Sequence, residues 1–305
     1  MLLDTASLYF RAFYGLPDSL RASDGTPVNA VRGLLDMIGR LVTDFAPSDL
    51  IACWDDDWRP QWRVDLLPTY KTHRVAQVVE AGPDIEVVPD LLQIQVPIIV
   101  DALTALGIPI LGAPGYEADD VIGTLASTAS GPVDVITGDR DLFQVVDDDR
   151  DVRVIYTGSG MRNLLIVTDS VVVEKYGVHA NQYADFATLR GDPSDGLPGV
   201  PGIGEKTAGS LLSRLGDMDA IIAAADQGTT GPLGTTARKI TAAADYLVQA
   251  PSVVAVVRNL DLPDVDAVIG VTAEGRAHLE ALRDRWNLGE SVGRAVRALE
   301  RAAAP

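Results

Sequence analysis

The sequence has a single cysteine, Cys53, and only three histidines among its 305 residues. One thiol excludes an internal disulfide and suits a reducing compartment. No HExxH, CxxC or histidine cluster is present, which argues against a zinc site. The apolar runs at 98–106 and 253–257 are too short to cross a bilayer, and we expect no secretory signal peptide. These absences predict a cytoplasmic protein without a membrane partner.

Cationic residues are also few, because 25 Lys and Arg stand against 43 Asp and Glu, a formal charge of −18. Nucleic-acid binding draws much of its affinity from phosphate neutralisation, so this balance alone argues against such a partner. The objection weakens if many acids share one pocket, where bound divalent cations would cancel their charge. The 47% hydrophobic content is that of a globular protein with one large domain, with or without a smaller one.

Short apolar segments alternate with helical periodicity in the first half of the chain. Strands are predicted at 1–3, 49–54, 108–111 and 133–137, with a hairpin at 152–167. Helices are predicted at 28–42, 89–106 and 117–128, and the pattern after residue 169 is almost wholly helical. Residues 72–88 have mixed periodicity and predict a mobile or partly helical insert. Together these patterns predict an α/β fold with a mostly parallel central sheet flanked by helices.

Acidic residues follow three of the predicted strands. Asp4, Asp55 and Asp139 stand directly after strands or within two residues of a strand end, and Asp141 follows closely. Ligands of open α/β sheets bind beyond the carboxyl ends of the strands. These four side chains are therefore expected to face one ligand site.

Two further acidic groups strengthen this expectation. Glu117, Asp119 and Asp120 open the predicted helix at 117–128, where the helix dipole alone would favour negative charge. Asp192 and Asp195 flank a turn, where such residues often cap helices. Capping explains one pair more readily than it explains so many acid-bearing strand ends and turns. Converging carboxylates repel unless cations lie between them, and hard oxygen ligands select Mg²⁺ or Mn²⁺. The pattern predicts two-metal hydrolysis of a phosphodiester.

A glycine-rich segment follows the acids, and residues 197–215 read LPGVPGIGEKTAGSLLSRL. Glycines let a backbone approach a phosphate, which the N–H groups at a helix start can bind. The segment lacks the lysine spacing of a Walker A loop and the third glycine of a dinucleotide fingerprint. It predicts a helix–hairpin–helix that holds a DNA backbone, the alternative being a Gly-Pro turn between helices. The residues expected at DNA are Gly199, Val200, Gly202, Ile203, Gly204, Lys206, Thr207, Arg238 and Lys239.

Six segments together resemble the bacterial 5′ nuclease (flap endonuclease) family, which includes the 5′-exonuclease domain of DNA polymerase I. They are LLDTASLYFRAF (2–13), WDDDWRPQWR (54–63), TYKTHR (69–74), YEADDVIGTLA (116–126), TGDRDLFQVV (137–146) and GDPSDGLPGVPGIGEKTA (191–208). The match runs from residue 2 to about 262 and includes no polymerase region. The resemblance implies a PIN-like 5′-nuclease fold, with a catalytic domain at 1–178, an arch insert at 72–92 and a helical subdomain at 179–305 that carries the helix–hairpin–helix.

The resemblance also implies roles for individual residues. Arg11, Lys71 and Arg74 would contact the scissile phosphate, although each could instead pair locally or be solvated. A potassium ion would bind carbonyls of the hairpin. Two or more Mg²⁺ or Mn²⁺ ions would bind between two groups of acids, the first being Asp4, Asp55, Glu117, Asp119, Asp120 and Asp139, and the second Asp141, Asp192 and Asp195.

The expected activity is flap endonuclease and 5′-3′ exonuclease action on branched or nicked DNA, by a monomer, in bacterial DNA replication or repair. The products would carry 5′-phosphate and 3′-hydroxyl ends. A PIN-like RNase is the alternative within the same fold, and a DNA-junction binder without activity is the alternative from another class. One feature departs from the family, because after Arg74 the arch is poor in Lys and Arg and carries Glu80, Asp84, Glu86 and Asp90.

Overall fold

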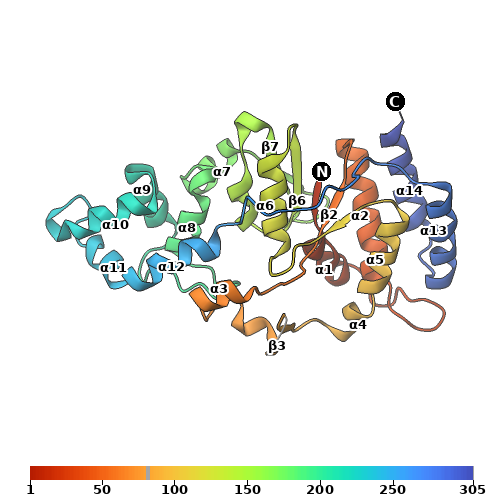
Figure 1. The fold of residues 1–305 in the computed structure, drawn as a ribbon, viewed down its shortest axis with the longest axis horizontal. Coiled ribbons are helices and arrows are strands. Elements are labelled where there is room, and N and C mark those ends of the chain that lie inside the picture. Colours follow the sequence, from red (N-terminus) through yellow and green to blue (C-terminus); the bar gives the residue numbers. More distant parts are fainter. Residues whose placement is uncertain (80–82, 305) are drawn as a thin grey trace.

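A six-stranded sheet forms the centre of the protein in the computed structural model, which describes residues 1–79 and 83–304 (Figure 1). The strand order is β5–β2–β1–β6–β7–β8, and the first five strands in that order are parallel, while β8 runs antiparallel to β7. The predicted α/β fold is therefore confirmed. The strands are β1 (Leu2–Asp4), β2 (Ile51–Cys53), β5 (Ile110–Leu111), β6 (Val133–Thr137), β7 (Val152–Tyr156) and β8 (Leu165–Val167).

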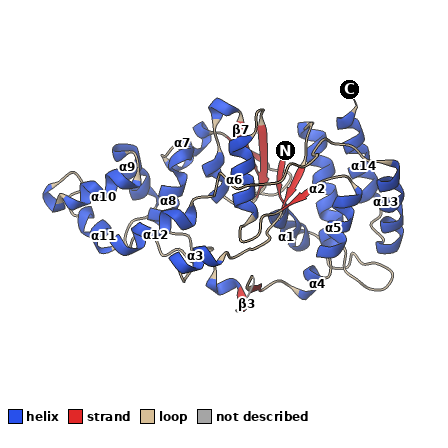
Figure 2. Ribbon diagram, in the orientation of Figure 1, coloured by secondary structure: helices blue, strands red, loops and turns tan. Residues whose placement is uncertain are grey.

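Helices cover both faces of this sheet (Figure 2). Because side chains alternate along a strand, Leu2 and Val135 enter one core while Leu3 and Ile136 enter the other. The second core is closed by α1 (Thr5–Gly15), α2 (Asn29–Phe45) and α5 (Val96–Ala105). The first is closed by α6 (Ala118–Thr128) and the 3₁₀ turn η2 (Asp141–Val145), with a further turn η3 at Asp148–Arg150. All the side chains in β1 are buried, so Asp4 at its end is held in place by the core.

The insert after β2 is organised differently from the prediction. The short helix α3 (Gln61–Leu66) and the turn η1 (Thr72–Arg74) lead into an antiparallel pair, β3 (Val75–Gln77) and β4 (Ile85–Glu86). A β-hairpin therefore replaces the expected partly helical structure; Glu80 lies outside the described residues. The helix predicted at 89–106 is divided into α4 (Asp90–Gln93) and α5. The division falls at Gln95, whose buried side chain accepts a hydrogen bond from the Ala30 N–H.

A group of short helices forms one end of the molecule (Figure 1). They confirm the helical pattern predicted after residue 169. No helix within residues 1–79 and 83–304 has the length and apolar character needed to cross a membrane. The elements are α7 (Asp169–Tyr176), η4 (Ala180–Gln182), α8 (Tyr183–Arg190), α9 (Glu205–Leu215), α10 (Met218–Asp226), η5 (Gly228–Thr230), α11 (Thr236–Ala242) and α12 (Ala244–Val254).

The last part of the chain returns to the sheet. Residues 255–272 are mostly extended and cross the molecule, with the Leu50 N–H bonded to the Ala267 carbonyl at 2.9 Å (Figure 1). Helices α13 (Ala273–Trp286) and α14 (Glu290–Ala303) then pack on α5 and α2. Gly39 allows the close approach of α14, because a Cβ there would lie 3.3 Å from the Ala295 Cα. Within the region predicted as the helical subdomain, 179–305, α13 and α14 thus pack on two helices of the predicted catalytic domain.

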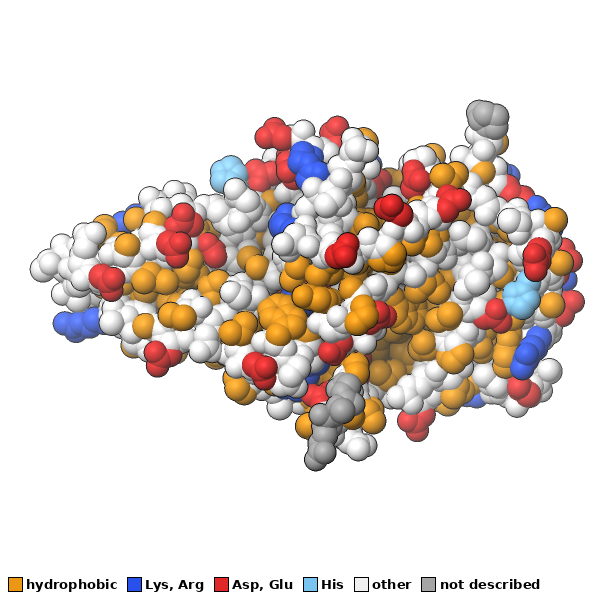
Figure 3. Space-filling view, in the orientation of Figure 1, with side chains coloured by type: hydrophobic (Ala, Val, Ile, Leu, Met, Phe, Trp, Pro, Cys, Tyr) orange, Lys and Arg blue, Asp and Glu red, His pale blue; other side chains and the backbone are white. Residues whose placement is uncertain are grey.

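Acidic side chains are spread over the face of the molecule seen in Figure 3, with fewer cationic ones among them. Much of the negative charge therefore lies on this surface in dispersed form. The acids that bear on function are the smaller set gathered at the strand ends.

Candidate active site

A cleft of about 440 Å³ lies beyond the carboxyl ends of β1, β2 and β6. This is where the fold type places ligands. Its lining joins residues far apart in sequence, from Asp4 to Ser194. Seven carboxylates and three cationic side chains line it: Asp4, Asp55, Glu86, Glu117, Asp119, Asp139, Asp192, Lys71, Arg74 and Arg140.

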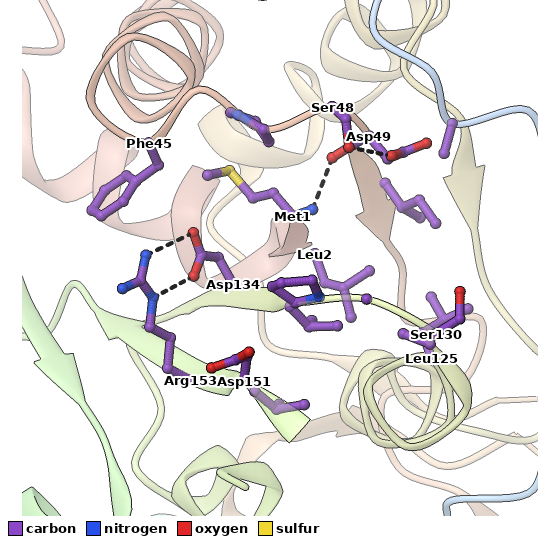
Figure 4. Close-up of a pocket in the computed structure, with 18 of the residues that line it drawn as sticks. Met1, Leu2, Phe45, Ser48, Asp49, Leu125, Ser130, Asp134, Asp151 and Arg153 are labelled. Atoms are coloured by element: carbon purple, nitrogen blue, oxygen red, sulfur yellow. Dashed lines mark hydrogen bonds and ion pairs between the residues drawn. The ribbon is translucent and has the colours of Figure 1, made fainter. Parts of the chain in front are cut away.

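A larger hollow of about 1040 Å³ lies at the opposite end of the strands, around Met1 and Leu2 (Figure 4). Its polar groups are engaged with one another. Arg153 pairs with Asp134 at 2.6 Å, and the Met1 amine donates to the Asp49 carbonyl at 2.8 Å. Size alone would favour this hollow, but the strand ends and the charged groups favour the smaller cleft as the functional site.

Asp4 lies at the centre of the cleft's acidic groups. It caps α1 by accepting the Ser7 N–H at 3.1 Å, and its other oxygen accepts the Thr137 hydroxyl at 2.6 Å. The pKa of Asp4 is raised to about 7, mainly by burial and also by the carboxylates of Asp55 and Asp139, while the Thr137 hydroxyl lowers it. Asp4 is thus both a cap and a member of a repelling acid group.

Asp55 and Asp119 complete the group on this side of the cleft. Asp55 accepts the Ala118 N–H at the start of α6 at 2.9 Å. Burial raises the pKa of Asp55, and the Glu117 carboxylate adds to the effect. The pKa of Asp119 is raised well above its usual range, mainly by burial and further by the negative charges of Asp4 and Asp139. Carboxylates from two strand ends and a helix start therefore face a common space.

A second acidic group lies beside the first. Burial raises the pKa of Asp141 well above its usual range, and the carboxylates of Asp139, Asp195 and Asp192 add to this. Burial raises the pKa of Asp195 to about 6, against the lowering effect of Lys71. Within the described part of the chain, nothing donates a hydrogen bond to the buried Asp141 Oδ1. Asp141 therefore lies near Asp139, Asp192 and Asp195, and of the three predicted acids of this group only Asp192 lines the cleft itself.

The turn that carries Asp192 and Asp195 is fixed against the base of the insert. The Lys71 N–H donates to the Asp195 carbonyl at 2.9 Å. Gly196 packs so closely on this segment that a Cβ would lie 2.1 Å from the Thr69 carbonyl oxygen. Arg190 donates to Asp192 Oδ2 at 3.0 Å. The second acidic group is therefore positioned by backbone contacts as well as by an ion pair.

The donor set fits a hard divalent cation. Among residues 1–79 and 83–304, no three His, Cys, Asp or Glu side chains already converge on one ligand position. The carboxylates instead surround the cleft, and a cation between them would relieve their repulsion and give Asp141 Oδ1 a partner. Carboxylate oxygens are the ligands that Mg²⁺ and Mn²⁺ prefer.

Asp120, which was predicted with the first metal group, is directed away from the cleft. Its side chain is fully buried, and Arg63 binds both of its oxygens at 2.8 Å. It also accepts the N–H groups of Glu117 and Val257. The reason is a reciprocal capping arrangement at the start of α6, which turns Asp120 back over the helix end. Asp120 is placed to join α6, α3 and the extended C-terminal segment.

Glu117 lies between this buried network and the cleft. Its Oε1 accepts Lys71 Nζ at 2.7 Å, and its Oε2 accepts Arg63 and the Tyr70 hydroxyl, each at 2.8 Å. Burial alone would raise the pKa of Glu117, but Lys71 and then Arg63 outweigh it, so the pKa is lowered. The ionised form of Glu117 is therefore favoured by the donors that its two oxygens accept, Lys71, Arg63 and Tyr70.

The three predicted cationic residues are placed differently. Lys71 has the left-handed φ of 47°, which is strained for a residue with a Cβ, and its ammonium group lines the cleft. Arg74 also lines the cleft, pairs with Glu86 and lies over the Trp58 ring. Arg11 does not line the cleft; it donates to the Gly158 carbonyl at 3.2 Å.

Several lining residues were not singled out from the sequence. Ser7 stands one helical turn after Asp4, and its hydroxyl accepts the Gly138 N–H at 2.9 Å. Arg140 stands between two predicted ligands, so its position in the chain was a usable signal. Glu86 gave no signal beyond being one of several acids in the insert. Asp56, which could have replaced Asp55, lies against Gly112 instead.

The glycine-rich segment joins α8 to α9 in a tight hairpin. Gly191 and Gly199 have positive φ and pack back to back, since a Cβ on Gly199 would lie 2.5 Å from the Gly191 nitrogen. Val200 and Ile203 are buried, so only their backbones could contact a ligand. Gly204 caps the start of α9, and Lys206, Thr207, Arg238 and Lys239 are exposed. Lys239 Nζ donates to the Gly202 carbonyl at 2.8 Å, which brings α11 to the hairpin.

Comparisons with known proteins cover nearly the whole chain. Residues 1–177 match the family model "5′-3′ exonuclease, N-terminal resolvase-like domain", and residues 178–273 match "5′-3′ exonuclease, C-terminal SAM fold". A relative named 5′-3′ exonuclease from Streptomyces coelicolor is 56% identical over 98% of this chain and 99% of its own. One of the same name from Mycobacterium tuberculosis is 47% identical over 98% and 97%. In fold, the chain is similar to the flap endonuclease of bacteriophage T5, solved as a pseudo-enzyme–product complex with DNA and metal ions (TM-score 0.62, 18% identity, 99% and 98% covered).

Proposed function

Because this chain belongs to the 5′-3′ exonuclease family, we propose that it is a nuclease that hydrolyses the phosphodiester bonds of DNA bearing a free 5′ strand, as a 5′-3′ exonuclease and a 5′-flap endonuclease. The observation that carries this proposal is the group of repelling carboxylates at the strand ends, with Lys71 and Arg74 beside them. An activity of this kind would serve DNA replication or repair. One copy of the chain carries all the residues proposed for it, so the protein would act as a monomer.

Two acidic groups would hold two or more Mg²⁺ or Mn²⁺ ions. When bound, these ions would activate water and neutralise charge on the phosphate under attack. The oxygens of Asp4, Asp55 and Asp139 are oriented by hydrogen bonds from backbone N–H groups and, for Asp4, from the Thr137 hydroxyl as well. Asp119 lines the same cleft. Glu117 contributes to this side once Lys71 releases its Oε1. The second group is Asp141, Asp192 and Asp195, of which Asp141 has an unsatisfied oxygen.

The cationic residues would position the phosphate and stabilise its developing charge. Lys71 and Arg74 already project into the cleft, held there by carboxylates that a phosphate can replace. Loss of an electrostatic group of this kind typically costs about 10²–10³ in rate. Arg11 lies next to Gly138, because a Cβ at position 138 would be only 3.6 Å from Arg11 Nη2. It would act on the cleft indirectly, through the loop that contains Gly138.

The hairpin would hold the duplex part of the substrate. A helix start with Gly204 as its cap leaves backbone N–H groups for a phosphate, and Lys206 and Thr207 stand next to them. The same loop, 191–204, begins with Asp192 at the cleft and ends at α9. The duplex grip and the cleavage site would therefore be joined by one short segment, which would set the distance between junction and cut. If water attacks the phosphorus and the 3′ oxygen is the leaving group, hydrolysis would leave 5′-phosphate and 3′-hydroxyl ends.

The test replaces Asp139 and Asp192 separately by Asn and measures cleavage of a 5′-flap DNA with Mg²⁺ or Mn²⁺. Cleavage should fall by at least about 10²-fold while DNA binding changes far less, because each change removes a proposed ion ligand. Asp65→Asn, an exposed acid of α3, is the matched control and should cut normally. Normal cleavage by both active-site variants would refute the site assignment. Parallel DNA and RNA flaps would separate this function from that of an RNase.

A further inference from the structure

The arch is the insert at residues 72–92. Two acidic side chains in its second half form ion pairs with arginines that precede the insert or lie near its start. Asp84 pairs with Arg59 at 2.6 Å, and these side chains are only 9% and 7% exposed. Glu86 in β4 pairs with Arg74, whose Nε lies 2.9 Å from Glu86 Oε1. Two of the acids that depart from the family pattern, Asp84 and Glu86, thus have specific partners within the chain.

The backbone fixes Glu86 beside Arg74. Strand pairing sets Val75 opposite Glu86, and the Val87 N–H donates to the Arg74 carbonyl at 2.8 Å. The ring of Trp58 lies under the Arg74 guanidinium at 5.4 Å. Both members of the pair line the cleft, and Glu86 is the more enclosed, at 15% exposed against 38% for Arg74. The carboxylate therefore occupies the Nε and Nη2 donors of Arg74, which a phosphate in the cleft could otherwise use.

A carboxylate and a phosphate are alternative partners for one guanidinium, because both accept its N–H groups in the same fork geometry. We propose that Glu86 is a specificity-determining residue of this nuclease: it occupies Arg74 in place of a phosphate, and a 5′ strand must displace it. This inference rests on the proposed function of the cleft. Displacing Glu86 costs the same free energy for every strand that binds Arg74. A substrate that is also bound by the hairpin has additional binding energy to offset this cost, so it should be favoured over a single strand without a duplex.

The experiment compares Glu86→Gln with Asp90→Asn, a matched control that removes one charge from an exposed acid of the same arch. Both changes are made in the wild type and in an Arg74→Met background. Binding of a labelled 5′-flap DNA is measured by fluorescence anisotropy in EDTA, so that hydrolysis does not interfere. A duplex closed by loops at both ends, without a 5′ strand, serves as the control ligand. Glu86→Ala is included so that the result does not depend on the hydrogen bonds of the Gln amide.

Glu86→Gln and Glu86→Ala should each tighten flap binding about fivefold, the size of a partly exposed ion pair. Asp90→Asn should change it less than about twofold, and the closed duplex should bind all variants equally. In the Arg74→Met background the gain at position 86 should vanish.

Unchanged or weaker flap binding by both position-86 variants would overturn the proposal. So would a gain that persists without Arg74, or an equal gain from Asp90→Asn, since either would indicate a general charge effect. The wild type is also assayed for flap cleavage with Mn²⁺. Failure there would refute the proposed function, whereas the binding comparison in EDTA decides the role of Glu86.

Discussion

Replacing Arg63 by Met should destabilise the protein more than any change in the cleft, because it removes the only cation that Asp120 contacts among the described residues. Arg63 is 2% exposed and makes three charged hydrogen bonds of 2.8 Å, one to Glu117 and two to Asp120. Breaking a buried ion pair by removing one partner typically costs about 3–5 kcal/mol. Glu117 keeps Lys71 and Tyr70, so the loss falls mainly on Asp120, which places the expected value near the lower limit, about 3 kcal/mol.

The assay is urea unfolding in EDTA, followed by tryptophan fluorescence and circular dichroism, with the free energy of unfolding taken by linear extrapolation. The second variant, Arg63→Met with Asp120→Asn, removes the uncompensated charge and keeps one acceptor oxygen, enough for one of the Glu117 and Val257 N–H groups. It should recover part of the loss. A loss below about 1 kcal/mol in the single variant, or no recovery in the double variant, would refute the view of Asp120 as a buried structural ion.

Other predictions concern the cleft and its supports. Asp4 and Asp195 have pKa values of about 7 and about 6, above the ordinary Asp value, so the folded state binds their protons more tightly than the unfolded state does. Their contribution to the free energy of unfolding is therefore most favourable in acid and is lost as the pH rises from about 4 through 7; for Asp4 the loss is on the order of 4 kcal/mol. Urea unfolding in EDTA should show this decline, and Asp4→Asn should make it smaller. Mn²⁺ should raise the free energy of unfolding more near pH 8 than near pH 5, and a pH-independent effect of Mn²⁺ would contradict the metal assignment. Asp55→Asn should lower flap cleavage by about 10²-fold or more, whereas the neighbouring Asp56→Asn should leave it within about twofold, and equal losses would contradict the placement of these two side chains. Gly196→Ala should reduce cleavage by shifting the Asp192 turn, because its Cβ would meet the Thr69 carbonyl; a fully active variant with unchanged stability would show that this contact adjusts freely.

The sheet and most of the cleft were predictable because they depend on local signals. Strand β1 ends at Asp4, and Asp55 and Asp139 follow two residues after the ends of β2 and β6. Because these strands are parallel, all three side chains lie at the carboxyl ends of the strands, whatever the packing of later elements. Asp120 could not be placed in this way. Spacing by three puts it on the same helix face as Glu117, but a buried arginine 57 positions earlier in the chain decides its direction. Long-range ion pairs of this kind leave no periodic trace in the sequence.

The arch and the C-terminal helices show the same limit at the level of elements. Residues 75–77 and 85–86 are too short to predict as strands on their own, and they pair because Arg59, Arg74 and Trp58 bind the returning segment. Helices α13 and α14 were predictable as helices. Their packing on α5 and α2 depends on small residues such as Gly39 and on the path of residues 255–272 across the molecule. Element type follows from local sequence, whereas partner choice follows from distant surfaces.

The net charge of −18, which argued against a DNA partner, is consistent with one once the acids are located. Some acids neutralise cations inside the fold, as Asp120 does for Arg63 and Asp84 for Arg59. Others form the cleft, where seven carboxylates against three cations leave an excess that divalent ions can balance. Glu86 belongs to both sets, because it pairs within the arch and also faces the cleft. The excess negative charge of the cleft therefore creates a demand for divalent ions, and raising the divalent-ion concentration should strengthen DNA binding in Asp139→Asn less than in the wild type.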